Sequence, residues 1–212
     1  MWLLRRSAGP RLVRAELAPL SDAEIAQLGD QGFFLRDRFL GEASALALRE
    51  AVEALRAGGR FQPAGLSRGG AYRIDPAVRG DAITWLSPEL PGLEGLFSSF
   101  TALRDGLNEA AYLGLERFDV QAAFYPGEGA HYARHRDAFP GQGNRRLTAI
   151  CYLNPAWRPE HGGALRLFLD AGPLDVEPVL DRLVVFLSER VEHEVLPAFA
   201  PRLAATAWFY GR

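Results

Sequence analysis

The sequence predicts an α+β protein whose first half supplies helices and whose second half forms a β-rich core. Two segments, 42–57 and 93–113, place apolar residues at helical spacing. From Phe118 onward the pattern changes to short apolar runs separated by turn residues, which indicates a β-sandwich or barrel. The chain has 212 residues, of which 48% are apolar, so we expect one domain with a substantial core.

The beginning of the chain differs in composition from the rest. Residues 1–19 carry several arginines among small residues, and we expect them to be a poorly ordered basic extension. Residues 20–212 are then expected to form a single domain. Its helices and a loop occupy 20–116, and its β core occupies 117–212.

The helices should support the β core from outside. Ser21-x-x-Glu24 is a capping box, which predicts a short helix that ends near Gly29. Short strands are expected at 33–35 and 81–86. The apolar faces of the two longer helices are formed by Leu46, Val52 and Leu55 in 42–57, and by Leu96, Phe100, Leu103 and Leu107 in 93–113.

Residues 58–78 are rich in glycine and proline and carry Arg60, Arg68 and Arg73. We expect a long segment without secondary structure here, and such segments in compact domains are usually functional or disordered.

The β core should contain eight short strands. They are expected at 118–125, 131–135, 146–153, 164–169, 174–178, 182–187, 192–195 and 202–210. Turns are expected at Pro126-Gly127, Pro140-Gly141, Gly162-Gly163 and Ala171-Gly172-Pro173. Eight short strands are typical of a double-stranded β-helix of the jelly-roll or cupin class.

The tripeptide His135-Arg136-Asp137 can place two metal ligands together, because residues i and i+2 of a strand share a face. His193, which follows an apolar strand, is the candidate third ligand. Two histidines and one carboxylate form the facial triad of non-haem Fe(II) oxygenases. The alternative is a polar pair in a surface turn and a hydrogen-bonded histidine at a strand end.

Arg202 opens the last apolar run, and a period of two places Arg202, Ala204, Thr206 and Trp208 on one face. A buried arginine needs an anion, and its planar guanidinium suits a carboxylate. A structural salt bridge is the alternative. A facial triad followed by such an arginine is what a 2-oxoglutarate site requires.

Several motifs, in order, resemble the Fe(II)- and 2-oxoglutarate-dependent dioxygenases. The resemblance is strongest to the prolyl hydroxylases that act on hypoxia-inducible factor and to their bacterial relatives. The similar segments are 79–85 (RGDAITW), 124–127 (FYPG), 135–137 (HRD), 150–154 (ICYLN), 162–168 (GGALRLF), 181–186 (DRLVVF), 193–195 (HEV) and 202–208 (RLAATAW). The resemblance implies the double-stranded β-helix topology and makes 20–212 a catalytic domain with 58–78 as its entrance loop.

The resemblance also assigns expected roles to individual residues. Iron is bound by His135, Asp137 and His193, and Arg202 with Tyr152 binds the distal carboxylate of 2-oxoglutarate. Tyr125 lines the cosubstrate pocket, and Thr206 either adds a hydroxyl donor or is an ordinary strand residue. The expected substrate-binding residues are Trp208, which walls the pocket beside the iron, and Asp81 and Arg145, which pair across the entrance. The alternatives are plain core packing for Trp208 and two solvated surface charges for Asp81 and Arg145.

The implied function is that of a peptidyl-prolyl 4-hydroxylase acting on a proline-containing loop of a protein, with succinate and CO2 as co-products. Fe(II), 2-oxoglutarate and O2 are the implied cofactor and cosubstrates, and ascorbate is a further candidate. Resemblance to bacterial members suggests elongation factor Tu as the protein substrate. Alternatives are the same chemistry on another side chain or a small molecule, and a non-catalytic cupin-like binding or sensor domain.

Composition excludes several other classes. A formal charge of −2 argues against nucleic-acid binding, and no apolar run is long enough to cross a membrane. The amino terminus lacks the apolar region of a secretory signal, and the single cysteine, Cys151, excludes an internal disulfide. We therefore expect a cytoplasmic protein. The sequence ends directly after the last strand, so substrate capture is expected to depend on 58–78.

Overall fold

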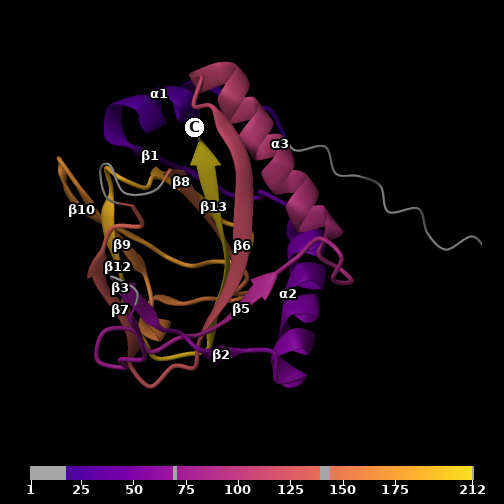
Figure 1. Ribbon diagram of the computed structural model, residues 1–212, viewed down its shortest axis with the longest axis vertical. Helices are drawn as coiled ribbons and strands as arrows, with labels where there is room; N and C mark the ends of the chain where they lie inside the picture. Colours follow the sequence, from indigo (N-terminus) through magenta and orange to yellow (C-terminus); the bar gives the residue numbers. More distant parts are fainter. Residues whose placement is uncertain (1–17, 69–70, 139–143, 212) are drawn as a thin grey trace, which may run out of the picture.

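Two antiparallel sheets form the centre of the computed structural model, which describes residues 18–68, 71–138 and 144–211 (Figure 1). The larger sheet has seven strands: β1 (Phe33–Arg36), β11 (Leu183–Leu187), β8 (Arg145–Tyr152), β13 (Arg202–Gly211), β6 (Leu115–Tyr125), β5 (Ala82–Leu86) and β2 (Gln62–Pro63). The smaller sheet has four: β10 (Gly172–Val176), β9 (Leu165–Leu169), β12 (Glu192–Ala198) and β7 (Ala130–His135). The α+β class and the double-stranded β-helix core are confirmed.

Three helices cover one face of the larger sheet: α1 (Asp22–Gln31), α2 (Glu42–Ala57) and α3 (Glu94–Ala111) (Figure 1). The predicted apolar face of α3 is fully buried. In α2 the buried residues are Ala45, Leu48 and Val52, so of the predicted face only Val52 is fully buried, whereas Leu46 and Leu55 are half-buried. The capping box of α1 is present, but the helix continues past Gly29 to Gln31, and Gly32 caps it in the left-handed conformation.

Alternation along β13 separates two hydrophobic clusters. Ala205, Ala207 and Phe209 pack with the helices, whereas Ala204 packs between the two sheets with Tyr125 and Tyr152. The face that carries Arg202 and Ala204 is therefore the inner face of the sheet, as the period of two predicted.

The segment 58–78 is more ordered than predicted. It contains β2 and an antiparallel hairpin of β3 (Leu66–Arg68) with β4 (Ala71–Arg73). The expectation of a segment without secondary structure is thus wrong, because paired backbone groups form even in this glycine-rich stretch. The predicted turn at Pro140-Gly141 and nearly all of the 1–19 extension lie outside the described residues.

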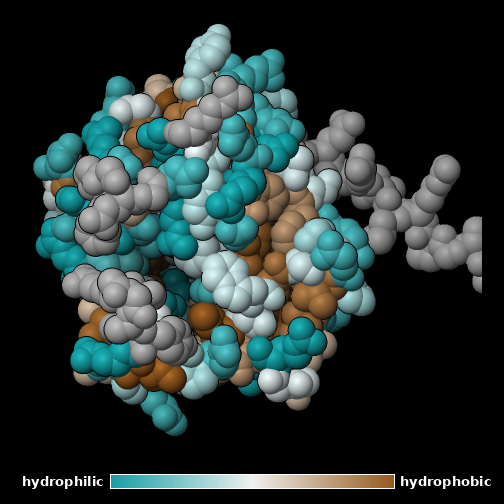
Figure 2. Space-filling model, in the orientation of Figure 1, coloured by the Kyte–Doolittle hydropathy of each residue, from teal (hydrophilic) through white to brown (hydrophobic). Residues whose placement is uncertain are grey.

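The surface outside the sheets is uneven in character. Figure 2 shows hydrophobic residues gathered between β6 and α3, where Trp85, Pro88, Phe97 and Phe118 line a hollow of about 430 Å³. No helix in the described part of the chain is long and apolar enough to cross a membrane.

Candidate active site

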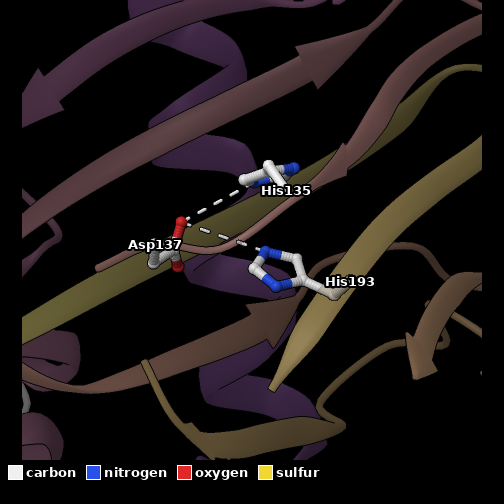
Figure 3. A group of neighbouring side chains, drawn as sticks. All are labelled: His135, Asp137 and His193. Carbon is white, nitrogen blue, oxygen red and sulfur yellow. Dashed lines mark ion pairs between the residues drawn. The ribbon is translucent and has the colours of Figure 1, made fainter. Parts of the chain in front are cut away.

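Pairing between β7 and β12 brings the three predicted metal ligands together. His193 lies directly opposite His135 in the register, and Asp137 follows two residues after His135 (Figure 3). Asp137 Oδ1 lies 3.7 Å from His135 Nε2 and 3.9 Å from His193 Nε2. Three potential ligand atoms thus converge from two strands and a short connection.

Contacts on the far side of each ring orient the histidines. Nδ1 of His135 lies 2.8 Å from the Ala133 carbonyl and Nδ1 of His193 lies 3.4 Å from the Val191 carbonyl, so each Nδ1 carries the proton. The Nε2 lone pairs are then free to bind a metal. Burial, followed by the proximity of His193, lowers the pKa of His135 to about 4, which keeps its ring neutral.

Asp137 uses its two oxygens differently. Thr148 Oγ1 donates to Oδ2 at 2.7 Å and Trp208 Nε1 donates to the same oxygen at 3.0 Å, which leaves Oδ1 toward the histidines. Ser188 Oγ lies 2.9 Å from Thr148 Oγ1. Burial raises the pKa of Asp137, but the two histidines and these hydrogen bonds lower it by more, so the pKa lies below its ordinary value. The carboxylate is therefore ionised.

Two imidazoles and one carboxylate on one side of a shared centre are the donor set preferred by non-haem Fe(II). The residues therefore fit this metal, and His135, Asp137 and His193 would hold it. The alternative of an unrelated surface pair and a separate histidine is excluded, since all three side chains are at least partly buried and face one another.

Arg202 lies on the inner face of β13 and is only 2% exposed. Its Nε donates to the Gly163 carbonyl at 2.8 Å, and no acidic side chain of the described residues forms an ion pair with it. Its guanidinium lies 5.0 Å from the Tyr125 ring and 5.1 Å from the Tyr152 ring. A structural salt bridge is thus the wrong explanation for Arg202.

The Tyr152 hydroxyl is buried and has no hydrogen-bond partner, and burial raises its pKa to about 12. A buried cation without a counter-ion beside an unsatisfied hydroxyl donor needs an anionic ligand. The Arg202 guanidinium and the Tyr152 hydroxyl together fit one carboxylate of 2-oxoglutarate. Gly163 completes the pocket wall, because a Cβ there would come within 3.0 Å of Arg202 Cδ.

Thr206 and Trp208 continue along the same face of β13. Thr206 is half-buried and pairs with Ile150 of β8, and its role as a hydroxyl donor stays a prediction. The Trp208 ring contacts Trp85 at 5.8 Å between centroids, and the Arg145 guanidinium lies 4.5 Å from the centre of the Trp208 ring. Trp208 therefore joins the metal ligand Asp137 to the rim of the site.

The expected pairing of Asp81 with Arg145 is wrong. Asp81 is bound in a fork by Arg79, at 2.8 and 2.6 Å, and its side chain is fully buried. Arg145 instead lies over Trp208 and donates to the Asp137 carbonyl at 3.3 Å. Arg79 is two residues from Asp81 on the same extended segment, so this local partner occupies both carboxylate oxygens.

Four contributing residues were missed by sequence reasoning: Arg79, Tyr132, Thr148 and Ser188. Tyr132 stacks on His135 with 3.7 Å between centroids, and Arg79 lies over the Tyr132 ring. Thr148 and Ser188 are fully buried hydroxyls near strands of apolar residues. The sequence offered a signal for Thr148 and Ser188, because a hydroxyl within or next to an apolar strand is expected to be buried and then needs a hydrogen-bond partner.

Comparison with known proteins agrees with the geometry. Residues 120–210 match the family model of the 2OG-Fe(II) oxygenase superfamily. The human prolyl hydroxylase EGLN3 is 37% identical over 193 residues, which cover 86% of this chain and 80% of that protein. The chain therefore belongs to the 2OG-Fe(II) oxygenase superfamily. Within it, the chain is an oxygenase related to the EGLN prolyl hydroxylases, with Fe(II) and 2-oxoglutarate implied by its triad.

Solved structures show the same relationship. A prolyl-4-hydroxylase from Pseudomonas putida is 38% identical with a TM-score of 0.81, and the match covers 90% of this chain and 98% of that one. A prolyl hydroxylase from Trichoplax adhaerens, solved with a peptide fragment of hypoxia-inducible factor, is 31% identical with a TM-score of 0.82. That match covers 88% of this chain and 87% of the other.

Proposed function

We propose that this oxygenase is a peptidyl-prolyl 4-hydroxylase that modifies a proline in a loop of another protein. The observation that carries the oxygenase assignment is the facial triad on one sheet together with the buried Arg202 on the inner face of the other, which forms no ion pair among the described residues. The protein substrate is supported by relatives over most of the chain, among them a prolyl hydroxylase bound to a peptide. The net reaction consumes 2-oxoglutarate and O2 and yields the hydroxylated residue, succinate and CO2.

Fe(II) with 2-oxoglutarate supplies the oxidising power to insert one oxygen atom of O2 into a substrate C–H bond. His135 is neutral and Asp137 is ionised, so together with the His193 ring the site offers the nitrogen and carboxylate ligands that a divalent metal needs. Arg202 and the Tyr152 hydroxyl bind the far carboxylate of the cosubstrate, which fixes its direction in the pocket.

The rim of the site supports a peptide substrate. Trp85 is 52% exposed and contacts Trp208, and the hydrophobic hollow begins at Trp85. Arg145 adds a half-buried positive charge over Trp208. An apolar surface next to a cation suits an extended segment whose backbone carbonyls and apolar side chains reach the iron site together.

The direct test is mass spectrometry of proteins from a cell lysate after incubation with the Fe(II)-loaded enzyme, 2-oxoglutarate and ascorbate in air. We expect a mass increase of one oxygen atom on a proline, which amino-acid analysis identifies as 4-hydroxyproline. Elongation factor Tu is the first purified substrate to examine, and with it a cytoplasmic location is proposed.

The matched control is Arg202→Ala, in which the cosubstrate carboxylate loses its guanidinium. We expect the binding free energy of 2-oxoglutarate to weaken by about 2–5 kcal/mol while metal affinity is retained. Hydroxylation of a different side chain or of a small molecule would overturn the prolyl assignment and leave the oxygenase assignment intact. Unchanged 2-oxoglutarate dependence in the variant would overturn the role of Arg202.

A further inference from the structure

Asn154 joins three segments behind the cosubstrate pocket and is 2% exposed. Its Nδ2 donates to the Pro178 carbonyl at 2.7 Å and to the Leu203 carbonyl at 3.0 Å. Its Oδ1 accepts from the Leu203 backbone N–H at 2.7 Å. The side-chain amide thus satisfies both donors and its acceptor entirely with backbone groups.

Tyr152 and Arg202, the two residues proposed to bind the cosubstrate carboxylate, are close along the chain to the groups that this amide joins. Tyr152 precedes Asn154 by two residues, and Arg202 is the chain neighbour of Leu203. The regular register between β8 and β13 starts at the pair Ala204 and Tyr152. Before that pair, the first residues of β13 are held on the β8 side mainly by the Asn154 side chain. One backbone hydrogen bond adds to it, from the Leu153 N–H to the Leu203 carbonyl.

Arg202 needs such an anchor. Its guanidinium is buried without a counter-ion, so the free energy of the unliganded protein would fall if the strand end moved and let the charge reach water. On the side of β13 that faces away from β8, the backbone of Arg202 pairs with Tyr125 of β6. A fixed Leu203 backbone opposes that movement and keeps the guanidinium beside the Tyr152 hydroxyl.

We propose that Asn154 is a positioning residue for 2-oxoglutarate, acting through the backbone of Leu203 on Arg202. The inference rests on the use of 2-oxoglutarate by the proposed function. This role differs from a purely structural one, because loss of the Asn154 hydrogen bonds should lower the affinity for the 2-oxoglutarate carboxylate and not only the stability of the protein.

The chain supplies a matched control. Asn108, near the end of α3, clamps Leu115 in the same way: Nδ2 donates to the Leu115 carbonyl at 2.8 Å and Oδ1 accepts from its N–H at 2.7 Å. Leu115 opens β6 and packs in the cluster under the helices, not in the one between the sheets. Asn108→Ala therefore removes the same type of clamp outside the cosubstrate pocket.

The test measures 2-oxoglutarate binding to the Mn(II)-loaded protein by calorimetry, where no turnover occurs. We expect Asn154→Ala to weaken this affinity by about 10- to 100-fold, the size of effect that a small misplacement produces. Mn(II) affinity should stay unchanged, and with Fe(II) the KM for 2-oxoglutarate should rise more than kcat falls. Asn108→Ala should lower the melting temperature without changing the affinity for 2-oxoglutarate.

Hydrogen exchange on the unaltered protein gives a second readout that does not depend on the folding of a variant. Binding of 2-oxoglutarate should slow exchange of the Leu203 amide and leave that of Leu115 unchanged. Equal 2-oxoglutarate affinity in Asn154→Ala and the unaltered protein, or a Leu203 amide indifferent to 2-oxoglutarate, would overturn the inference. An unaltered protein that binds Mn(II) but no 2-oxoglutarate would overturn the proposed function itself.

Discussion

Asp137 shows how one carboxylate serves both ligation and orientation. Both hydrogen-bond donors, Thr148 Oγ1 and Trp208 Nε1, bind Oδ2, whereas Oδ1 faces the two histidines. Because the single Thr148 proton is directed at Asp137, Ser188 must be the donor in their mutual hydrogen bond. A relay of two buried hydroxyls thus fixes the rotation of the metal-binding carboxylate.

Thr148→Val should weaken metal binding, since valine has the same shape but no hydroxyl. Loss of a group that orients a ligand typically reduces metal affinity about 10- to 100-fold. Titration with Mn(II), followed by calorimetry, measures the change. Thr148→Ser keeps the hydroxyl and should restore most of the affinity. Reduced affinity in the serine variant with normal affinity in the valine variant would mean that packing of the methyl group matters and the hydrogen bond does not.

At the scale of elements, α1 is fastened to β1 by one partly buried ion pair. Arg36 Nε and Nη2 each donate to Glu24 at 2.7 Å, and Glu24 also completes the capping box with Ser21. Although burial raises the pKa of Glu24, hydrogen bonds from Arg36 and Ser21 lower it below its ordinary value of 4.5. One carboxylate therefore caps the helix and ties it to the sheet.

Glu24→Gln should lower the free energy of unfolding at neutral pH by about 1–3 kcal/mol, the usual contribution of hydrogen bonds to a charged group. Because the folded pKa is depressed, this stabilisation is present above the unfolded pKa and is lost as pH falls through the folded pKa. Denaturant unfolding of the two proteins at neutral pH and in acid measures the loss of stability and its dependence on pH. A difference between the two proteins that persists undiminished in acid would contradict the assignment.

The segment before β5 reaches the iron site through Arg79, whose guanidinium lies over Tyr132 while Tyr132 stacks on His135. Asp81→Asn should therefore destabilise the protein, since breaking a buried pair costs about 3–5 kcal/mol. Thermal unfolding measures this change. The charge-swapped pair Asp81→Arg with Arg145→Asp should restore nothing, because the two residues bind different partners.

Arg145→Ala should have a different effect, because Arg145 covers Trp208 at the rim and takes no part in the Asp81 pair. We expect hydroxylation of a protein substrate to fall while uncoupled decarboxylation of 2-oxoglutarate continues. Succinate release with and without substrate separates the two activities. Parallel loss of both would show that Arg145 supports Asp137, whose carbonyl it contacts, and not the substrate.

At the scale of the whole molecule, the site lies where the two sheets meet. His135 and His193 come from the smaller sheet, whereas Thr148, Tyr152, Arg202 and Trp208 come from the larger one. A ligand that contacts residues of both sheets therefore binds the folded protein and not the unfolded chain.

Mn(II) should raise the melting temperature in a concentration-dependent manner, and 2-oxoglutarate should add to the rise only when the metal is present. Mass action gives about 2.7 kcal/mol of stabilisation at a metal concentration one hundred times Kd. Scanning calorimetry measures the shift. His135→Ala should fold and show no metal-dependent shift; a normal shift in that variant would refute the ligand set.

Local patterns in the sequence determined the class of the fold and the chemistry of the site. The alternation that begins at Arg202 placed Ala204, Thr206 and Trp208 on one face, and the spacing of His135 and Asp137 directed both toward one centre. Such features depend on the period of a strand or helix, which neighbours along the chain define. The order of the strands came instead from the resemblance to a known family.

Only the tertiary structure decided which partners each side chain has. Asp81 binds Arg79 and not Arg145, and the Thr148 hydroxyl reaches Asp137 from another strand. The absence of a counter-ion at Arg202 and the anchoring of Leu203 by Asn154 likewise depend on segments that are distant in sequence. Long-range packing brings these groups together, so the pattern of any one segment cannot contain them.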